Sequence, residues 1–338
     1  MTSSARLFTL FAFSLLLSIC SLAQQNTAFP LFKGLYLGQK LPGMTPEIFA
    51  PGIVSTGMLT RDVAMTPDGK EIYFGAAIGN YAVSTILVTK YIDGCWTEPE
   101  VMKYMDDPKY LQLEPFISPD GKRFFFLSTR PDQDGVEGDQ DIWVMDRTGD
   151  GWGKPYNLGS PLNTEQSEYF PSVTRSGTMY FTRSEKGSRA SFLYRSKYIN
   201  GQYATPEKLP PQVNCGQSQF NAFIDPDERF IIVPATGRPD SRGSTDYYLV
   251  FRNPDDTWQE PINMGDAINT PSGLEYSPYV SPDGKYFFFM SSRLLPNDQW
   301  PPVITRQFLL NLHNQPQNGN PAIYWMSADV IEQLRSKK

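Results

Sequence analysis

Two glutamates and four arginines recur at equivalent places in this sequence, and their side chains could transfer protons or hold an anion. Glu168 lies nine residues before Gly177, and Glu275 lies nine residues before Gly284. The arginines each follow an apolar or aromatic run, at Arg130, Arg183, Arg238 and Arg293. Two carboxylates that flank a sugar linkage can hydrolyse it, and arginine holds carboxylates by paired hydrogen bonds. These residues are therefore candidates for glycoside chemistry, or for binding an acidic sugar or a peptide terminus.

A repeat carries these residues and must position them. Three copies contain a Pro-Asp-Gly turn that ends at Gly69, Gly121 or Gly284, and each turn is followed by an aromatic run. Two degenerate copies end at Gly177 and Glu228, so that the copies recur every 51 to 56 residues. A period of this length predicts stacked modules of supersecondary structure.

Each copy predicts four antiparallel strands. In the second copy, extended segments at 112–117 and 123–127 flank a turn in which proline fixes φ and glycine takes a positive φ. The later segment is apolar without alternation, which indicates burial on both faces. A third strand at 141–145 and an outer strand at 152–158 complete the unit. Such units packed around an axis predict an all-β protein, a β-propeller of five blades. Six blades, with one eroded unit after Arg293, are the alternative.

The two ends of the repeat region are complementary. Residues 46–56 resemble the outer strand of a unit that lacks its first three strands, and residues 322–326 resemble a third strand with no fourth. We therefore expect the N-terminal strand to complete the last blade and close the ring. This predicts a single propeller domain over 46–335, preceded by a lead-in at 24–45. The segment 329–334 predicts a short helix.

The first 23 residues predict a signal peptide. A positively charged start and an apolar core over 7–19 are followed by small residues up to Ala23. Cys20 raises the alternative of a lipid anchor, although Ile19 before it is larger than lipoprotein signals require. No later apolar stretch reaches the length of a membrane span. We therefore expect a periplasmic or secreted protein.

The composition is typical of a turn-rich β protein and excludes one class of partner. Aromatic residues make up 14% of the chain, which also contains 29 prolines and 26 glycines. The net charge is −6 and the isoelectric point is near 5.0. The basic footprint of a nucleic-acid-binding protein is therefore missing.

The turn tetrads, together with residues 138–143, resemble the WD-like β-propeller repeats of TolB-type proteins. The resemblance covers roughly residues 35–335, and the tetrads at 174–177 and 225–228 depart from the motif. It implies a propeller fold and a location outside the cytoplasm. It implies little about chemistry, because the family includes scaffolds, carbohydrate-related proteins and accessory domains of peptidases.

Long loops should gather on one face of the propeller. In a four-stranded blade, the loop between the second and third strands shares a face with the exit to the next blade. Here those loops are long, at 128–140, 184–191, 234–245 and 291–320. Long loops without regular structure often carry function, so we expect a ligand site at the channel mouth on this loop-rich face.

The expected ligand-binding residues on this face are charged or aromatic. They are Arg130, Glu168, Tyr169, Arg183, Arg238, Glu275, Arg293 and Trp300. Of these, Tyr169 and Trp300 could stack on a ligand. The alternative is that each arginine pairs with an acid of the neighbouring blade and stabilises the ring.

One acidic loop suggests a metal. Asp132, Asp134 and Asp139 surround a glycine turn with oxygen ligands at alternating positions, as Ca²⁺ prefers. The spacing does not match a helix-loop-helix calcium site, and a solvated acidic loop is the alternative. We expect no other cofactor.

The sequence gives weak support for catalysis. The one histidine, His313, lies in the last long loop, and no nucleophile motif accompanies it. The favoured hypothesis is a non-catalytic extracytoplasmic propeller that binds a protein, peptide or glycan on its loop-rich face. The alternative is a carbohydrate-active enzyme, either a glycoside hydrolase or a polysaccharide lyase, with Glu168 and Glu275 as its catalytic carboxylates.

Overall fold

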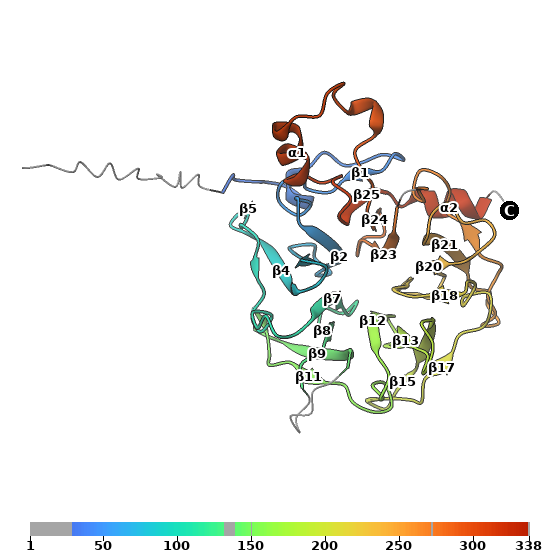
Figure 1. The fold of residues 1–338 in the computed structure, drawn as a ribbon. Helices are drawn as coiled ribbons and strands as arrows, with labels where there is room; N and C mark the ends of the chain where they lie inside the picture. Colours follow the sequence, from blue (N-terminus) through green and yellow to red (C-terminus); the bar gives the residue numbers. More distant parts are fainter. Residues whose placement is uncertain (1–28, 132–138, 150, 272, 337–338) are drawn as a thin grey trace, which may run out of the picture. The chain divides into compact units, whose positions relative to one another are not determined.

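Five β-sheets surround a common axis in the compact unit formed by Leu31–Lys338 (Figure 1). The computed structural model describes residues 29–131, 139–149, 151–271 and 273–336. The sheets are antiparallel, and each contains four or five strands. The prediction of an all-β propeller with five blades is confirmed. Within the described ranges, no helix is both long and apolar enough to cross a bilayer.

The blades follow one another along the chain. Blade 1 contains β2 (Leu59–Met65), β3 (Glu71–Ile78), β4 (Val83–Ile92), β5 (Cys95–Trp96) and β6 (Glu100–Val101). Blade 2 contains β7 (Gln112–Ile117), β8 (Arg123–Ser128), β9 (Asp141–Thr148), β10 (Gly151–Trp152) and β11 (Tyr156–Asn157). Blade 3 contains β12 (Glu168–Val173), β13 (Met179–Ser184), β14 (Ser191–Ser196) and β17 (Glu207–Lys208). A hairpin of β15 (Tyr198–Ile199) and β16 (Gln202–Tyr203) extends from blade 3.

Blades 4 and 5 complete the ring. Blade 4 contains β18 (Ser218–Gln219), β19 (Phe223–Ile224), β20 (Phe230–Thr236), β21 (Asp246–Phe251) and β22 (Ile262–Asn263). Blade 5 contains β23 (Glu275–Val280), β24 (Tyr286–Ser291), β25 (Ala322–Ser327) and β1 (Glu47–Ile48). The helical elements are η1 (Tyr36–Gly38), η2 (Asn297–Gln299), α1 (Arg306–His313) and α2 (Asp329–Ser336).

The tetrads form the turns between the first two strands of each blade. In blade 2, Ser118 Oγ donates to Asp120 Oδ1 over 2.6 Å, and the same oxygen accepts from the backbone N–H of Lys122. Gly121 takes a φ of 72°, which glycine adopts without steric cost. The same bonds recur at Thr66 and Asp68 in blade 1 and at Ser281 and Asp283 in blade 5. The local chemistry of the tetrad therefore fixes the turn.

The ring closes where the two ends of the propeller meet. β1 pairs antiparallel with β25, with Glu47 opposite Trp325 and Ile48 opposite Tyr324. Phe49, which follows β1, is fully buried, and its ring lies 5.0 Å from that of Phe288 and 5.1 Å from that of Trp325. The predicted closure is confirmed, although the strand is shorter than residues 46–56, because the chain turns at Ala50 and Gly52 with positive φ.

The 291–320 stretch is the main departure from the predicted elements. It contains η2 and α1 rather than a structureless loop. Thr305 caps α1 by accepting from the backbone N–H of Phe308 over 3.1 Å, a start signal that the sequence carries. No residue of α1 is buried, so the helix adds no sixth blade. The short helix predicted for the tail is confirmed as α2.

The aromatic contacts of Phe49 predict the effect of removing it. Phe49→Ala should lower the free energy of unfolding by about 3–5 kcal/mol, since it leaves a cavity at the closure. Leu35→Ala is the control, because Leu35 is 64% exposed and its loss should cost less than about 0.5 kcal/mol. Urea denaturation of both variants measures the difference. Equal stabilities would contradict the role of the closure.

Candidate functional site

The inner strand of every blade contains one residue in the left-handed region. Each lies seven residues before the last residue of its tetrad. They are Asp62, Glu114, Phe170, Asn221 and Ser277, with φ between 50° and 63°. The register shifts at this point in β2, β7, β12 and β23, and in blade 4 the residue separates β18 from β19. Each inner strand therefore has a bulge, a device that re-aims side chains.

Arg61, beside the first bulge, lies at the centre of the groups that the bulges bring together. Its Nε lies 2.7 Å from Asp62 Oδ2, and its Nη2 lies 2.7 Å from Glu114 Oε1. Nη2 also donates to Ser277 Oγ over 3.3 Å, and Nη1 donates to Tyr81 over 3.2 Å. Arg61 is only 7% exposed. Its charge is therefore balanced by buried carboxylates rather than by water.

Glu114 extends this network to the remaining blades. Its Oε1 accepts from Asn221 Nδ2 over 3.1 Å, and its Oε2 accepts from the backbone N–H of Phe170 over 2.7 Å. Asn221 also donates to Ser277 over 3.3 Å. Burial raises the pKa of Glu114 to about 7, and Arg61 opposes that rise. We call Arg61, Asp62, Glu114, Asn221 and Ser277 the axial cluster. With the backbone of Phe170, it joins all five blades at the axis.

A cavity of about 370 Å³ adjoins the axial cluster on the loop-rich face. Its lining includes Arg61, Glu114 and Asn221 of the cluster. Four half-buried aromatic side chains also line it, from Tyr81, Tyr169, Phe220 and Tyr276. The volume is within the range of small-molecule sites. We call this space the axial cavity.

The aromatic side chains of the axial cavity are fixed by contacts with one another and with the cluster. Arg61 lies 4.7 Å from the centre of the Tyr276 ring. The hydroxyls of Tyr81 and Tyr276 are 2.8 Å apart, and Phe220 meets Tyr276 edge to face at 6.0 Å. Tyr169 donates its hydroxyl to Ser191 over 2.9 Å. The cavity is therefore largely pre-formed.

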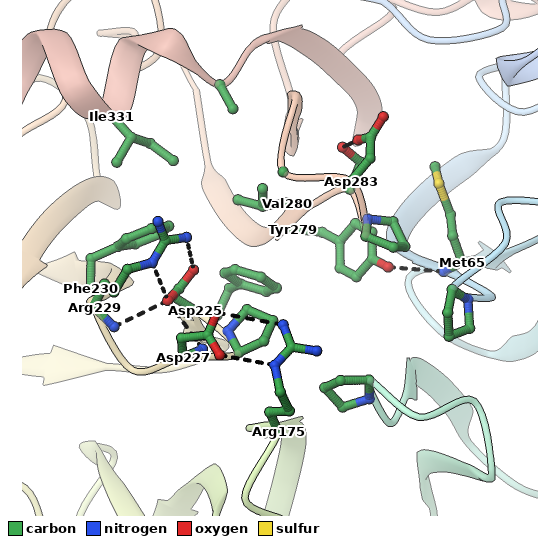
Figure 2. Close-up of a pocket in the computed structure, with 18 of the residues that line it drawn as sticks. Met65, Arg175, Asp225, Asp227, Arg229, Phe230, Tyr279, Val280, Asp283 and Ile331 are labelled. Carbon is green, nitrogen blue, oxygen red and sulfur yellow. Dashed lines mark hydrogen bonds and ion pairs between the residues drawn. The ribbon is translucent and has the colours of Figure 1, made fainter.

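The opposite face has a cavity of about 470 Å³, formed by the tetrad turns and the start of α2 (Figure 2). Figure 2 shows two ion pairs among its lining residues, Arg175 with Asp227 and Arg229 with Asp225. Prolines of four tetrads line it, so its walls are a consequence of the repeat. The axial cavity differs, because no repeated motif forms its lining, to which blades 1 to 5 contribute Arg61, Glu114, Tyr169, Asn221 and Tyr276 respectively. We therefore take the axial cavity as the candidate site.

The four recurring arginines do not line the axial cavity. Each donates to a backbone carbonyl in the segment that leads into its own blade. Those carbonyl oxygens belong to Tyr104, Leu162, Cys215 and Ile268, at 2.7–3.0 Å from Arg130, Arg183, Arg238 and Arg293 respectively. The side chains also lie over aromatic rings of their own blades. The arginines thus tie each blade to its entering segment. The alternative to ligand binding was that each arginine pairs with an acid of the neighbouring blade. The observed carbonyl partners belong to the arginine's own entering segment instead.

Glu168 and Glu275 are buried within their own blades. Glu168 accepts from Arg183 Nε and from Thr164 Oγ1, both at 2.6 Å. Glu275 Oε1 accepts from Thr270 and Ser291 at 2.7 and 2.9 Å. Among the described residues, Glu275 Oε2 has no hydrogen-bond partner. Burial raises the pKa of both carboxyls, to about 7 for Glu275.

The remaining predicted residues are divided. Tyr169 lines the axial cavity, whereas Trp300 donates to the carbonyl of Leu295 over 2.9 Å and packs near Phe308. Asp132 and Asp134 lie outside the described residues, and burial raises the pKa of Asp139. Among the described residues, no group of three or more metal-binding side chains is present. The Ca²⁺ site stays a prediction.

Sequence reasoning did not find Arg61, Glu114, Asn221, Tyr81 or Tyr276. Repetition of a residue type between blades is a signal for structural residues. The axial residues carry no such signal, because they differ from blade to blade. The constant seven-residue offset from each tetrad was the available signal, since it places Asp62 and Glu114 in equivalent positions.

Comparisons with known proteins find likeness only to solved structures. No protein-family model matches the chain, and no curated protein matches it. TolB from Acinetobacter baumannii is 16% identical with a TM-score of 0.44, covering 79% of this chain and 54% of TolB. The arabinanase of Bacillus subtilis is 12% identical with a TM-score of 0.46, covering 81% of this chain and 95% of the arabinanase.

A third solved structure has a similar level of likeness. An oligogalacturonate lyase in complex with manganese is 12% identical with a TM-score of 0.41, covering 80% of this chain and 66% of the lyase. The chain spans about half the length of TolB.

The raised pKa of Glu275 predicts a pH dependence of stability. Below pH 4.5, its ordinary pKa, the carboxyl is protonated in both the folded and unfolded states. As the pH rises toward 7, the unfolded chain loses this proton first, so the contribution of Glu275 to stability should fall by up to about 3 kcal/mol. Glu275→Gln should remove this decline in urea denaturation between pH 4.5 and 7.5. Glu100→Gln, at an exposed carboxylate, is the control, and an unaltered profile in Glu275→Gln would refute the prediction.

The axial cluster predicts that Arg61 stabilises the ring. Arg61→Met should lower the free energy of unfolding at pH 7.5 by about 3–5 kcal/mol, because two buried carboxylates lose their cation. Arg61→Lys, which keeps the charge without the planar fork, should fall between this variant and the native protein. Arg175→Met removes the exposed pair with Asp227 and should cost about 1 kcal/mol or less. Equal losses for Arg61→Met and Arg175→Met would contradict the account.

Proposed function

We propose that the protein is a non-catalytic, exported β-propeller that binds a glycan in the axial cavity on its loop-rich face. One observation carries the proposal. Four aromatic side chains line a pre-formed cavity whose polar lining offers a guanidinium, a carboxylate and an amide. Aromatic rings provide flat, rigid surfaces for stacking, and mixed donors and acceptors suit the hydroxyls of a sugar.

The charge balance of the cavity favours a sugar over a peptide terminus. Arg61 is already paired with Asp62 and Glu114 at 2.7 Å. A charged terminus would therefore meet a cluster in which the positive charge is already compensated. The cavity is also concave, and its volume of about 370 Å³ is that of a small-molecule site rather than of a broad protein–protein interface. A neutral sugar matches this arrangement best.

The position of the carboxylates supports binding without catalysis. A glycosidase needs two accessible carboxyl groups on either side of the scissile bond, about 5–9.5 Å apart. Asp62 and Glu114 instead share one arginine, and each is only 3% exposed. Both oxygens of Glu114 already accept hydrogen bonds. Neither group is free to contact a leaving oxygen in this arrangement.

A carbohydrate-active enzyme is the second candidate, and one observation favours it. Burial raises the pKa of Glu114 to about 7, which is the range of a general acid that works near neutral pH. In this role Glu114 would first have to give up its hydrogen bond from Arg61 or from the backbone of Phe170 before it could donate a proton to the substrate, with Asp62 as the second carboxylate. Glycoside hydrolase and polysaccharide lyase activity both remain within this candidate.

Export forms part of the proposal. The apolar segment at 7–19 and the small residues before Gln24 support secretion to the periplasm or the medium. A lipid anchor at Cys20 and a Ca²⁺ ion at Asp132, Asp134 and Asp139 are further variants of the proposal, and both involve residues outside the described ranges. The acidic chain, with a net charge of −6, favours no nucleic-acid partner.

The proposal predicts that the aromatic side chains contribute to affinity. A panel of neutral xylo-, arabino-, cello- and malto-oligosaccharides should include a ligand detectable by calorimetry. Tyr276→Ala should weaken its binding about tenfold or more, because a stacking surface above Arg61 is lost. Tyr156→Ala is the control, since Tyr156 lies on the outer strand β11. Unaltered binding by Tyr276→Ala, or no binding by the panel, would refute the proposal.

A turnover assay separates the two candidates. The binding proposal predicts no new sugar ends and no unsaturated product when the native protein is incubated with the same panel and with polygalacturonate. Turnover that Glu114→Gln abolishes would establish the enzyme instead. Glu168→Gln and Glu275→Gln serve as controls, because these carboxyls lie outside the axial cavity.

A further inference from the structure

A second cavity, of about 640 Å³, adjoins the axial cavity on the loop-rich face. It lies between blade 1 and the segment of blade 5 that follows α1. Tyr81 and Tyr276 line both cavities, and their hydroxyls are 2.8 Å apart. The hydrogen-bonded tyrosines therefore form the boundary where the two spaces meet. We call the second space the outer cavity.

The lining of the outer cavity combines apolar side chains, such as Met58, Ile78 and Leu274, with polar groups from uncharged residue types. Its described lining residues include no Asp, Glu, Lys or Arg. Their polar groups come from Thr56, Asn80, His313, Asn314 and Asn320. Side-chain amides both donate and accept hydrogen bonds. In a chain whose residues are 20% charged, such a surface favours a ligand that has hydroxyls and no charge.

The wall of the outer cavity is held in place before any ligand binds. The side chains of Asn318 and Asn320 donate to the carbonyl of Gly57 over 3.0 and 2.9 Å. A Cβ atom at Gly57 would lie 2.4 Å from the carbonyl oxygen of His313, so only glycine permits this close approach. The segment after α1 is thus fixed against blade 1. A pre-formed wall lowers the entropic cost of binding.

We propose that the axial and outer cavities are successive subsites of one cleft that binds a linear, neutral oligosaccharide. The chain would run from the floor at Arg61 across the Tyr81–Tyr276 boundary to the amides of Asn80 and Asn314. This inference rests on the proposed function and adds the ligand class, a polymer segment rather than a single sugar. Two observations carry it: the tyrosines that line both cavities and the absence of charged side chains from the described lining of the outer cavity.

The test is the dependence of affinity on chain length. Native protein is titrated with neutral oligosaccharides of two to six sugar units from each series in the panel. Affinity should rise at least about tenfold from the disaccharide to the longest chain, since more subsites are filled. The double variant Asn80→Gly with Asn314→Ala should reduce this gain, and glycine keeps the positive φ of 53° at position 80.

A matched control and a second variant keep the outcomes distinct. Asn311→Ala changes an exposed amide on α1 that bonds Gln307 and does not line the outer cavity, so it should keep the native gain. Tyr276→Ala should weaken binding of both short and long chains. Binding that is independent of length, or a gain that the double variant retains, would overturn the cleft and leave the axial site intact. No binding at any length would instead contradict the proposed function itself.

Discussion

The buried ion pairs of Arg61 hold the centre of this propeller. A guanidinium that is 7% exposed needs carboxylates close by, and Asp62 and Glu114 supply them at 2.7 Å. Since Glu114 also accepts from Asn221 and from the backbone of Phe170, the cluster links the inner strands through charge as well as packing. Arg61, Glu114 and Asn221 also line the axial cavity, so side chains that hold the centre together also form part of the candidate site.

The left-handed bulge makes this arrangement possible. In a regular inner strand, successive side chains point alternately toward the two neighbouring blades. Such a strand would direct its side chains at those blades and not at the axis of the ring. One residue with positive φ in each blade changes the register, and the strand then contributes a polar group at its loop-rich end. The residues that follow the bulge are apolar and buried in several inner strands, as Phe116 and Ile117 of β7 illustrate.

Much of the fold follows from local signals in the sequence, whereas the site does not. The Pro-Asp-Gly tetrads predict five blades, because the chemistry of a turn is contained in a few adjacent residues. The incomplete units at the two ends predict the closure at β1, because one unit lacks the strand that the other has. The cap at Thr305 that starts α1 is also a local signal. Recurrence between blades made candidates of Glu168, Glu275 and the four arginines. In the structure, these repeated residues form hydrogen bonds that tie each blade to its entering segment. Arg61 donates a hydrogen bond to Glu114, which lies 53 residues later in the chain. The bulges that bring these residues together have no characteristic residue type in the sequence.

Repeated residues build the ring, and we propose that unrepeated ones at its axis bind a ligand. The most direct test is a crystal structure of the protein with the oligosaccharide that calorimetry identifies. The account predicts a sugar ring stacked on Tyr276 above Arg61, with the chain continuing toward Asn80. Sugar density in the tetrad-lined cavity at Arg175 and Asp227, with the axial cavity unoccupied, would contradict it.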